Sequence, residues 1–435
     1  MPDKKISDLT ELEQLDASTD VLPVADALGN TISRQFINQP SLFPFTNAFE
    51  TKKIKLSNLP MSTIALDQSF PYTVYFKDSA AAVTTNTTTI DGTFSFAGSD
   101  IDIHIGTNVT GIGDQAFQNS SITSIVIPDS VAAIGEDAFR TCTSLTSLKL
   151  SERLDGGNEL NTIGDDAFRE CTSLTSIDIP EIVNRMGEGV FRSCTSLTSA
   201  TIGATSIGDF TFMDCANLSS VTIRDSVTEL GDSVFQNCTS LTTITIPENV
   251  SNIGESAFSS SGLTSIVLSS RMNSISASTF DGCTSLASVT IPEGVTSIGS
   301  RAFQNNTSLT TITIPNSMLT IGNLAFYQSG LTKIVIPNKV TSIGEFALAF
   351  MTSLTDLTIG SGLTSIGNQA FDGCTSLATI SSLATTAPTL TTSSVFQNIA
   401  ATQIHVPPGS KASYEAAGDD GTTYGGLIIV DDLIV

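Results

Sequence analysis

The chain has 435 residues and a formal net charge of −24, because 43 Asp and Glu outnumber 19 Lys and Arg. Nucleic acids and anionic membrane surfaces are bound through clustered Lys and Arg, so this balance argues against both as partners. No apolar stretch approaches the roughly 18 residues of a membrane span, so the sequence also predicts no membrane insertion.

The first 60 residues do not share the repeat that fills most of the chain. They contain three short phrases, Lys4–Leu12, Thr19–Asp26 and Glu50–Leu59, and they begin without the apolar segment of a secretory signal. So short a segment supports only a marginal core, which favours docking onto a partner. The apolar residues expected to make that contact are Val21, Leu22, Val24, Ile54, Leu56 and Leu59.

These three phrases resemble the attachment module of bacteriophage tail-fibre and head-fibre proteins. The resemblance implies attachment to other virion proteins, commonly as a homotrimer, and a location on the virion surface. A spacer at residues 29–49, which contains Pro40 and Pro44, departs from that pattern. A small cap or a leader segment is the alternative interpretation of residues 1–60.

Residues 61–100 are rich in Thr and Ala and predict a connector followed by an N-terminal cap. The segment Tyr72–Phe76 has the composition of a strand. We expect Phe94 and Phe96 to begin an aromatic column that continues through the repeats.

A repeat of about 23 residues occupies residues 101–396. Its reference phrase is Ile134–Leu145, and equivalent aliphatic residues recur at spacings of 21 to 29 residues. A period of this length predicts a leucine-rich-repeat solenoid of about 12 to 13 coils, each with a β-strand and a short helix or 3₁₀ segment. The aliphatic positions are Ile112, Ile134, Ile163, Met186, Ile207, Leu230, Ile253, Ile275, Ile298, Ile321, Ile343 and Ile366.

Leu241–Ile246 illustrates the strand of each coil. Ile244 and Ile246 are expected to point inward, while Thr243 and Thr245 point outward, and Pro247 ends the ladder because it has no N–H. The outward column should line a concave face. Its members are Val126, Lys149, Asp178, Thr201, Thr222, Thr245, Val267, Thr290, Thr313, Val335 and Thr358.

All seven cysteines occupy one position of the repeat, eight residues after the aliphatic residue. We expect reduced, buried fillers there, because other coils place Ser, Asn or Met at the same position and sulfur chemistry is not required. A second column of Phe should stack through the core, with Leu348 replacing Phe once. The cysteines are Cys142, Cys171, Cys194, Cys215, Cys238, Cys283 and Cys374.

An acidic residue follows the Gly of most coils, as in Asp114, Glu136, Asp209 and Asp232. An acid there suits the first turn of a short helix. A ladder of calcium sites is the functional alternative, but one carboxylate per coil supplies too few oxygen ligands. The sequence therefore predicts no metal site and no cofactor.

One coil carries an insertion, residues 151–158, which is either a tolerated loop or a contact loop. Lys149 and Asp178 flank it and interrupt the Thr and Val of the outward column. We therefore place the candidate binding surface on the early coils and expect it to contact a host-surface protein or glycan. Its candidate residues are Lys149, Arg153, Asp155, Asp178, Thr201, Thr222 and Thr245.

The repeat phrase resembles the BspA-like, or treponemal-type, leucine-rich-repeat family over residues 94–430. The closing segment 397–435, with Tyr414, resembles the terminal element of that family and is expected to form a C-terminal cap. The resemblance implies a surface protein that functions in adhesion and is not an enzyme. Fold alone does not establish that function.

Catalytic arrangements have little support. The two histidines, His104 and His405, lie about 300 residues apart, which excludes a Ser-His-Asp arrangement and a two-histidine zinc site. Three hypotheses remain: a non-enzymatic virion protein that displays the solenoid for host binding, a cellular BspA-like adhesin on a bacterial surface, and a polysaccharide-degrading virion enzyme. We expect the first.

Overall fold

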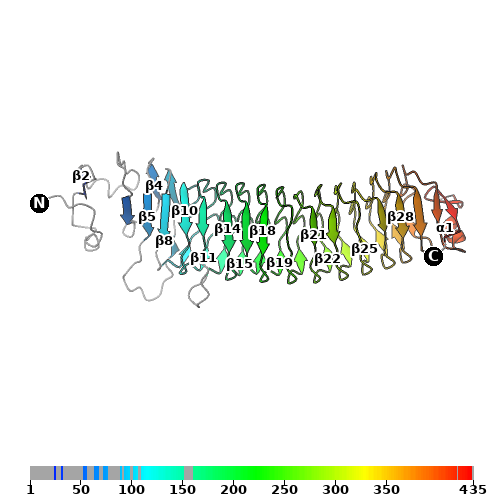
Figure 1. Cartoon of the computed structure of the whole chain (residues 1–435), viewed down its shortest axis with the longest axis horizontal. Coiled ribbons are helices and arrows are strands. Elements are labelled where there is room, and N and C mark those ends of the chain that lie inside the picture. The colour runs from blue at the N-terminus through cyan, green and yellow to red at the C-terminus, as the bar shows by residue number, and fades with distance from the viewer. Residues whose placement is uncertain are drawn as a thin grey trace. The chain divides into compact units, whose positions relative to one another are not determined.

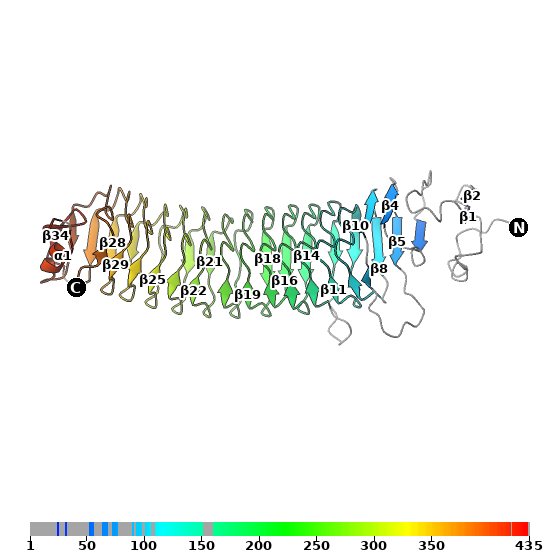
Figure 2. The ribbon, with the colours of Figure 1, turned by 180° about the vertical axis from the view of Figure 1, so that it is seen from behind.

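The computed structural model describes residues 105, 109–150, 160–418 and 420–433 with their side chains, and the backbone of eight strands between residues 24 and 105 (Figure 1). The chain divides into two compact units, unit 1 at residues 1–176 and unit 2 at residues 177–435. Within each unit, successive strands lie side by side in both views (Figures 1 and 2).

The described strands of unit 1 pair in parallel, apart from one antiparallel pair, β1 (Val24–Ala25) with β2 (Thr31–Ile32). β4 (Thr63–Asp67) pairs in parallel with β7 (Thr93–Ala97). The five-stranded parallel sheet contains β3 (Lys52–Lys55), β5 (Tyr72–Phe76), β8 (Ile101–Ile105), β10 (Ile122–Val126) and β12 (Ser147–Lys149). The shorter parallel strands are β6 (Thr89–Ile90), β9 (Gly111–Ile112), β11 (Ala133–Ile134) and β13 (Thr162–Ile163).

Unit 2 alternates longer and two-residue strands, so most coils contribute one strand of each kind. The longer strands are β14 (Ser176–Ile179), β16 (Ser199–Ile202), β18 (Ser220–Ile223), β21 (Ser265–Val267), β23 (Ser288–Thr290), β26 (Lys333–Val335), β28 (Asp356–Ile359), β30 (Thr379–Ser382), β32 (Gln403–His405) and β34 (Leu427–Val430). The two-residue strands of the repeats are β15 (Arg185–Met186), β17 (Ser206–Ile207), β19 (Glu229–Leu230), β20 (Asn252–Ile253), β22 (Ser274–Ile275), β24 (Ser297–Ile298), β25 (Thr320–Ile321), β27 (Ser342–Ile343), β29 (Ser365–Ile366) and β31 (Thr389–Leu390).

These parallel strands confirm the predicted leucine-rich-repeat solenoid. The aliphatic residues that define the repeat fall in the two-residue strands, where Ile207 pairs with Leu230 and Ile298 with Ile321. In unit 1, parallel pairing begins at β3, which lies inside residues 1–60. The predicted boundaries between attachment module, connector, solenoid and cap remain a prediction.

The segment after each two-residue strand consists of consecutive tight turns, where the sequence predicted a short helix or 3₁₀ piece. In one coil of unit 2, the N–H of Gln236 donates to the carbonyl of Ser233 within the coil, whereas the N–H of Phe235 donates to Ala257 in the next coil. Half of these N–H groups therefore leave the coil, which a helix with its i to i−4 bonds would not permit. Ser233 and Asn237 adopt φ angles of 52° and 61° to allow this alternation.

The reference strand Leu241–Ile246 differs from its prediction in one respect, since these residues are not in a strand. The predicted alternation of its side chains is nevertheless present. Ile244 and Ile246 are 8% and 7% exposed, whereas Thr243 and Thr245 are exposed.

The predicted aromatic column forms the core of the turn segments. Within each unit, successive Phe rings stack with centroids 4.9–5.7 Å apart and interplanar angles of at most 14°. Leu348 interrupts the column between Phe326 and Phe371 and is itself fully buried. The predicted first members, Phe94 and Phe96, belong to β7, and their side chains lie outside the described residues.

The seven cysteines are free, buried thiols, as predicted. Most of these thiols also make a hydrogen bond that the sequence did not indicate. The Sγ of Cys238 donates to the carbonyl of Phe212 in the preceding coil at 3.2 Å, and other cysteines make the same contact. Burial raises the pKa of the Cys142, Cys215 and Cys374 thiols to about 12.

The C-terminal end of unit 2 contains α1 (Lys411–Ala417), the one α-helix among the described residues, and β33 (Thr423–Tyr424), which pairs antiparallel with β34. Tyr414 and Tyr424 are fully buried and in edge contact, with ring centroids 4.9 Å apart. Their hydroxyls donate to Ser382 Oγ at 2.6 Å and to the Pro388 carbonyl at 2.6 Å. These contacts attach the terminal segment to the last coils.

Replacing Phe235 by Ala should destabilise unit 2 by about 3–5 kcal/mol, because it removes a fully buried ring that stacks on Phe212 and Phe258. Unfolding should also become less cooperative, since each coil is stabilised by its neighbours. Chemical denaturation followed by circular dichroism measures both effects. The exposed Thr243→Ala serves as the control, and an unchanged midpoint for Phe235→Ala would contradict the role of the column.

Stability should fall as the pH rises above about 9. An unfolded thiol ionises near its ordinary pKa of 9.0, whereas folded Cys142, Cys215 and Cys374 hold their protons to about 12. The stabilisation is complete below pH 9 and decreases by at most about 1.4 kcal/mol per pH unit for each thiol between these values. Denaturation midpoints from pH 8 to 11 test this, and Cys215→Ala should show a shallower decline than the parent chain.

Candidate functional site

In unit 2, the outward side chains of the longer strands and of the equivalent segments 241–246 and 311–314 form a surface that we call the strand face. Its central column is in register where neighbouring strands pair, since Thr201 pairs with Thr222, Val267 with Thr290 and Val335 with Thr358. The segments 241–246 and 311–314, which lie between these pairs, are not in strands. A parallel column two residues earlier consists mainly of Ser and Thr, as in the pair Ser265 and Ser288. Hydroxyl and methyl groups therefore dominate this face.

Four of the candidate binding residues lie on the strand face of unit 2, namely Asp178, Thr201, Thr222 and Thr245, and Lys149 has the equivalent strand position in unit 1. Lys149 lies at the end of β12, is exposed and is in register with Val126, which is 53% exposed. Thr222 and Thr245 are exposed, whereas Thr201 is half-buried. Arg153 and Asp155 of the insertion lie outside the described residues. That these residues bind a partner remains a prediction.

Asp178 is not a free carboxylate on this face. Both of its oxygens accept hydrogen bonds from Nη2 of Arg224, at 2.9 and 3.2 Å, and Arg224 Nη1 lies 3.4 Å from the carbonyl of Ile179. The Arg224 side chain reaches across one intervening coil, where Gly203 leaves it room, because a Cβ there would lie 2.9 Å from Nη1. The ion pair neutralises a charge that the sequence suggested was available to a ligand.

The sequence contained a signal for this pair that the prediction missed. Arg224 stands where most coils have the strand-ending Pro, and Gly203 stands at the same position one coil earlier. Asp178 and Arg224 are 46 residues apart, which is the length of two coils. An arginine is long enough to span two coil spacings, whereas the expected contacts extended only to adjacent coils.

A second ion pair lies further along the strand face of unit 2. Lys333 Nζ is 3.3 Å from Asp356 Oδ2, and the two residues are in register on β26 and β28. The Thr355 hydroxyl, which donates to Asp356 at 2.7 Å, and the nearby Lys333 lower the pKa of Asp356. Between the two ion pairs, the central column from Thr201 to Thr313 is uncharged.

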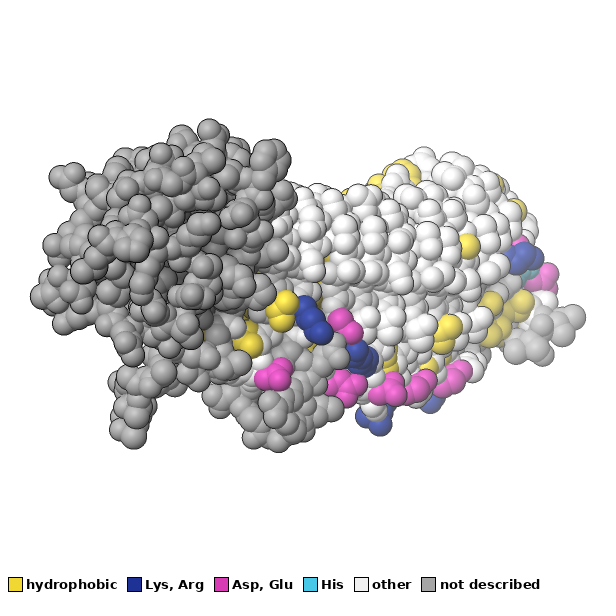
Figure 3. Space-filling view, turned by 60° about the vertical axis from the view of Figure 1, so that its left-hand side comes forward, with side chains coloured by type: hydrophobic (Ala, Val, Ile, Leu, Met, Phe, Trp, Pro, Cys, Tyr) yellow, Lys and Arg dark blue, Asp and Glu magenta, His cyan; other side chains and the backbone are white. Residues whose placement is uncertain are grey.

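Much of the described surface in Figure 3 is uncharged, with Asp and Glu side chains gathered along one edge. In the turn segments, part of the acidic column has a structural role. Asp209 Oδ1 accepts the N–H of Asp232 at 2.7 Å, and Asp232 Oδ1 accepts the N–H of Glu255 at 2.6 Å. These carboxylates therefore join consecutive coils.

Among the described residues, no group of three or more His, Cys, Asp or Glu is placed to hold a metal ion.

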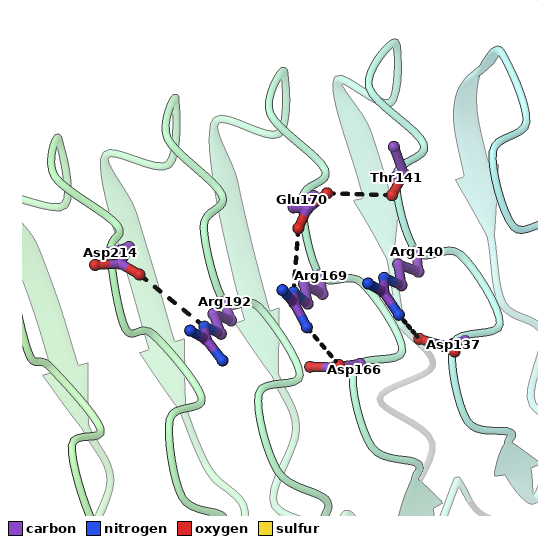
Figure 4. A network of polar contacts seen from close by, with 8 residues as sticks. All are labelled: Asp137, Arg140, Thr141, Asp166, Arg169, Glu170, Arg192 and Asp214. Carbon is purple, nitrogen blue, oxygen red and sulfur yellow. Dashed lines mark hydrogen bonds and ion pairs between the residues drawn. The ribbon is translucent and has the colours of Figure 1, made fainter.

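Arginines of the turn segments are also paired with acids (Figure 4). In unit 1, Arg140 contacts Asp137 at 3.2 Å, and Arg169 contacts Asp166 at 3.0 Å and Glu170 at 3.2 Å. In unit 2, Arg192 and Asp214 lie at the limit of an ion pair, 4.0 Å apart. The sequence analysis did not identify these pairs, although the arginines share one repeat position.

The two histidines were weighed in the sequence analysis as members of a catalytic or zinc-binding arrangement. His405 Nδ1 lies 2.8 Å from Asp432 Oδ1 at the C-terminal end of unit 2, and His104 belongs to β8, where side chains lie outside the described residues. The described part of the chain contains no helix with the length and apolar character of a membrane span.

The attachment residues predicted in residues 1–60 cannot be placed on a surface. Val24 belongs to β1 and Ile54 to β3, but their side chains lie outside the described residues. Val21, Leu22, Leu56 and Leu59 also lie outside them. Their contact with other virion proteins, and the homotrimer, remain predictions.

Comparison with known proteins identifies the repeat. The model of the BspA type leucine rich repeat region matches residues 67–198, 205–329 and 319–416, and no curated protein matches the chain. A leucine rich cell surface protein from Faecalibacterium prausnitzii is 30% identical, with 63% of this chain and 83% of that chain covered and a TM-score of 0.40. A leucine-rich repeat protein from Bacteroides ovatus is 22% identical, covering 75% and 88%, with a TM-score of 0.43. The pneumococcal vaccine antigen PcpA is 20% identical, covering 75% and 85%, with a TM-score of 0.45. None of these matches indicates an enzyme family, and the chain belongs to the BspA type leucine-rich-repeat family.

Proposed function

We propose that this chain is a non-enzymatic virion protein that displays its solenoid for binding to a host surface. The observation that supports the proposal is the strand face, where hydroxyl and methyl groups recur in the coils of unit 2 and are in register in three pairs of strands. Its charged members are neutralised in the pairs Asp178–Arg224 and Lys333–Asp356. Such a face suits an uncharged partner, either a glycan or a neutral protein surface, because no ionic group must be desolvated without a counter-ion.

The virion location rests on the resemblance of residues 1–60 to phage attachment modules. In this proposal, those residues hold the protein on the particle through other virion proteins, and the solenoid faces outward. If three chains assemble at the attachment site, weak contacts at three strand faces act together, so a modest affinity per face is sufficient.

A cellular surface adhesin is the second candidate, and the family match favours it. The F. prausnitzii protein is described as a cell surface protein, and the family covers most of this chain. The two candidates share the strand face as the binding surface. They differ only in what residues 1–60 attach to.

Replacing Thr290 by Lys should weaken binding to host cells at least tenfold. The change places an unpaired cation on the uncharged column beside Val267, where a bound partner would desolvate it. Thr284→Lys is the matched control, because Thr284 is exposed in the same coil but lies outside the strand face. Fluorescent, purified chain titrated onto host cells measures the effect, and equal binding by the two variants would contradict the strand face as the contact.

Deleting residues 1–60 should abolish incorporation into particles while leaving the solenoid folded. The test adds full-length and deleted chains to particles that lack the protein, and mass spectrometry of purified particles measures incorporation. Circular dichroism of the deleted chain checks that it is folded. Incorporation without residues 1–60 would disprove the attachment role, and recovery of the full chain only from the cell-surface fraction of a bacterium would favour the adhesin.

A further inference from the structure

The repeat position of the cysteines, which we call the rung, is not filled uniformly in unit 2. Its occupants in chain order are Cys194, Cys215, Cys238, Ser261, Cys283, Asn306, Ser329, Met351 and Cys374. Three consecutive rungs, Asn306, Ser329 and Met351, therefore lack cysteine. All of these side chains are buried.

A cysteine at the rung donates one hydrogen bond to a backbone carbonyl. Sγ donates to the carbonyl of the Phe, or of Leu348, in the preceding coil at 3.2 Å for Cys215 and Cys238, 2.9 Å for Cys283 and 3.1 Å for Cys374. Ser261 also has a side-chain partner, because its Oγ lies 3.4 Å from Cys283 Sγ.

Asn306 and Ser329 differ from these rungs. Asn306 is 0% exposed, and neither its Nδ2 nor its Oδ1 has a hydrogen-bond partner in the chain. Ser329 is 3% exposed, and its Oγ has no partner either. Buried amides and hydroxyls are almost always hydrogen-bonded, because leaving them without a partner forfeits the bonds that they make to water when unfolded.

The backbone brings these two rungs together. The N–H of Gly330 donates to the carbonyl of Asn306 at 3.0 Å, which joins the coils beside both side chains. The coil of Ser329 is also shorter at this point, since Ser329–Leu331 occupies the place of Asn306–Leu309 in the coil before it. Met351 follows on the next rung, and its thioether is only a weak acceptor.

We propose that Asn306 and Ser329 hold one ordered water molecule inside the solenoid. The amide offers two donors and an acceptor, and the hydroxyl offers a donor and two acceptors. A water accepting from Nδ2 and donating to Ser329 Oγ gives both side chains a partner. Buried waters typically make two to four such bonds to groups that the protein leaves unsatisfied.

A high-resolution crystal structure of the full chain tests this site directly. One well-ordered density peak within about 3.2 Å of Asn306 Nδ2 and Ser329 Oγ is expected. A direct hydrogen bond from Asn306 to the Phe280 carbonyl, with no peak between the two rungs, would overturn the proposal.

Oxygen-17 relaxation dispersion in solution provides a second measurement, because it counts long-lived internal waters. Asn306→Cys introduces the side chain that bonds directly in other coils, so the count should fall by one. Ser261→Cys is the matched control and should leave the count unchanged, since Ser261 already has a partner in the chain. An unchanged count for a folded Asn306→Cys chain would show that no water occupies this site.

Discussion

Hydrogen bonds between consecutive coils are the interaction on which this structure depends. In the turn segments, alternate N–H groups cross to the next coil, as Phe235 does to Ala257 and Phe258 to Thr279. The remaining N–H groups close turns within the coil, which brings residues such as Ser233 to positive φ. A single coil cannot satisfy these crossing groups, so the backbone itself requires a neighbour before any side chain is considered.

The side chains at fixed repeat positions meet the same requirement in different ways. Stacked Phe rings fill the space between coils, cysteine thiols donate to carbonyls of the coil before, and acids such as Asp232 accept N–H groups of the coil after. This explains why a chain of charge −24 tolerates an acid in so many coils. Several of these carboxylates are backbone acceptors, and arginines such as Arg169 neutralise acids at other positions of the turn segments.

The repeat period was sufficient to predict the solenoid, the Phe column and the buried cysteines, because each reflects which side chains face inward. It did not predict the turn geometry, since periodic burial shows where side chains point and not where N–H groups donate. The Asp178–Arg224 pair was missed for a different reason, as it connects coils that are not adjacent. Binding by the strand face and attachment by residues 1–60 depend on partners, about which burial patterns carry no information.

The repetition of the same side chains along the strand face would give a ligand several equivalent binding positions. From Thr201 to Thr313 the central column has Thr in every coil except that of Val267. A ligand that repeats at the spacing of parallel strands, about 4.8 Å, would find several equivalent positions. Because these positions are equivalent, the bound ligand would have several arrangements of equal energy, which would make binding more favourable in entropy. The ligand could also shift by one coil and make the same contacts again. A ligand without that period would match the groups of one coil only, so under the proposed function the strand face would favour a partner with a repeating structure.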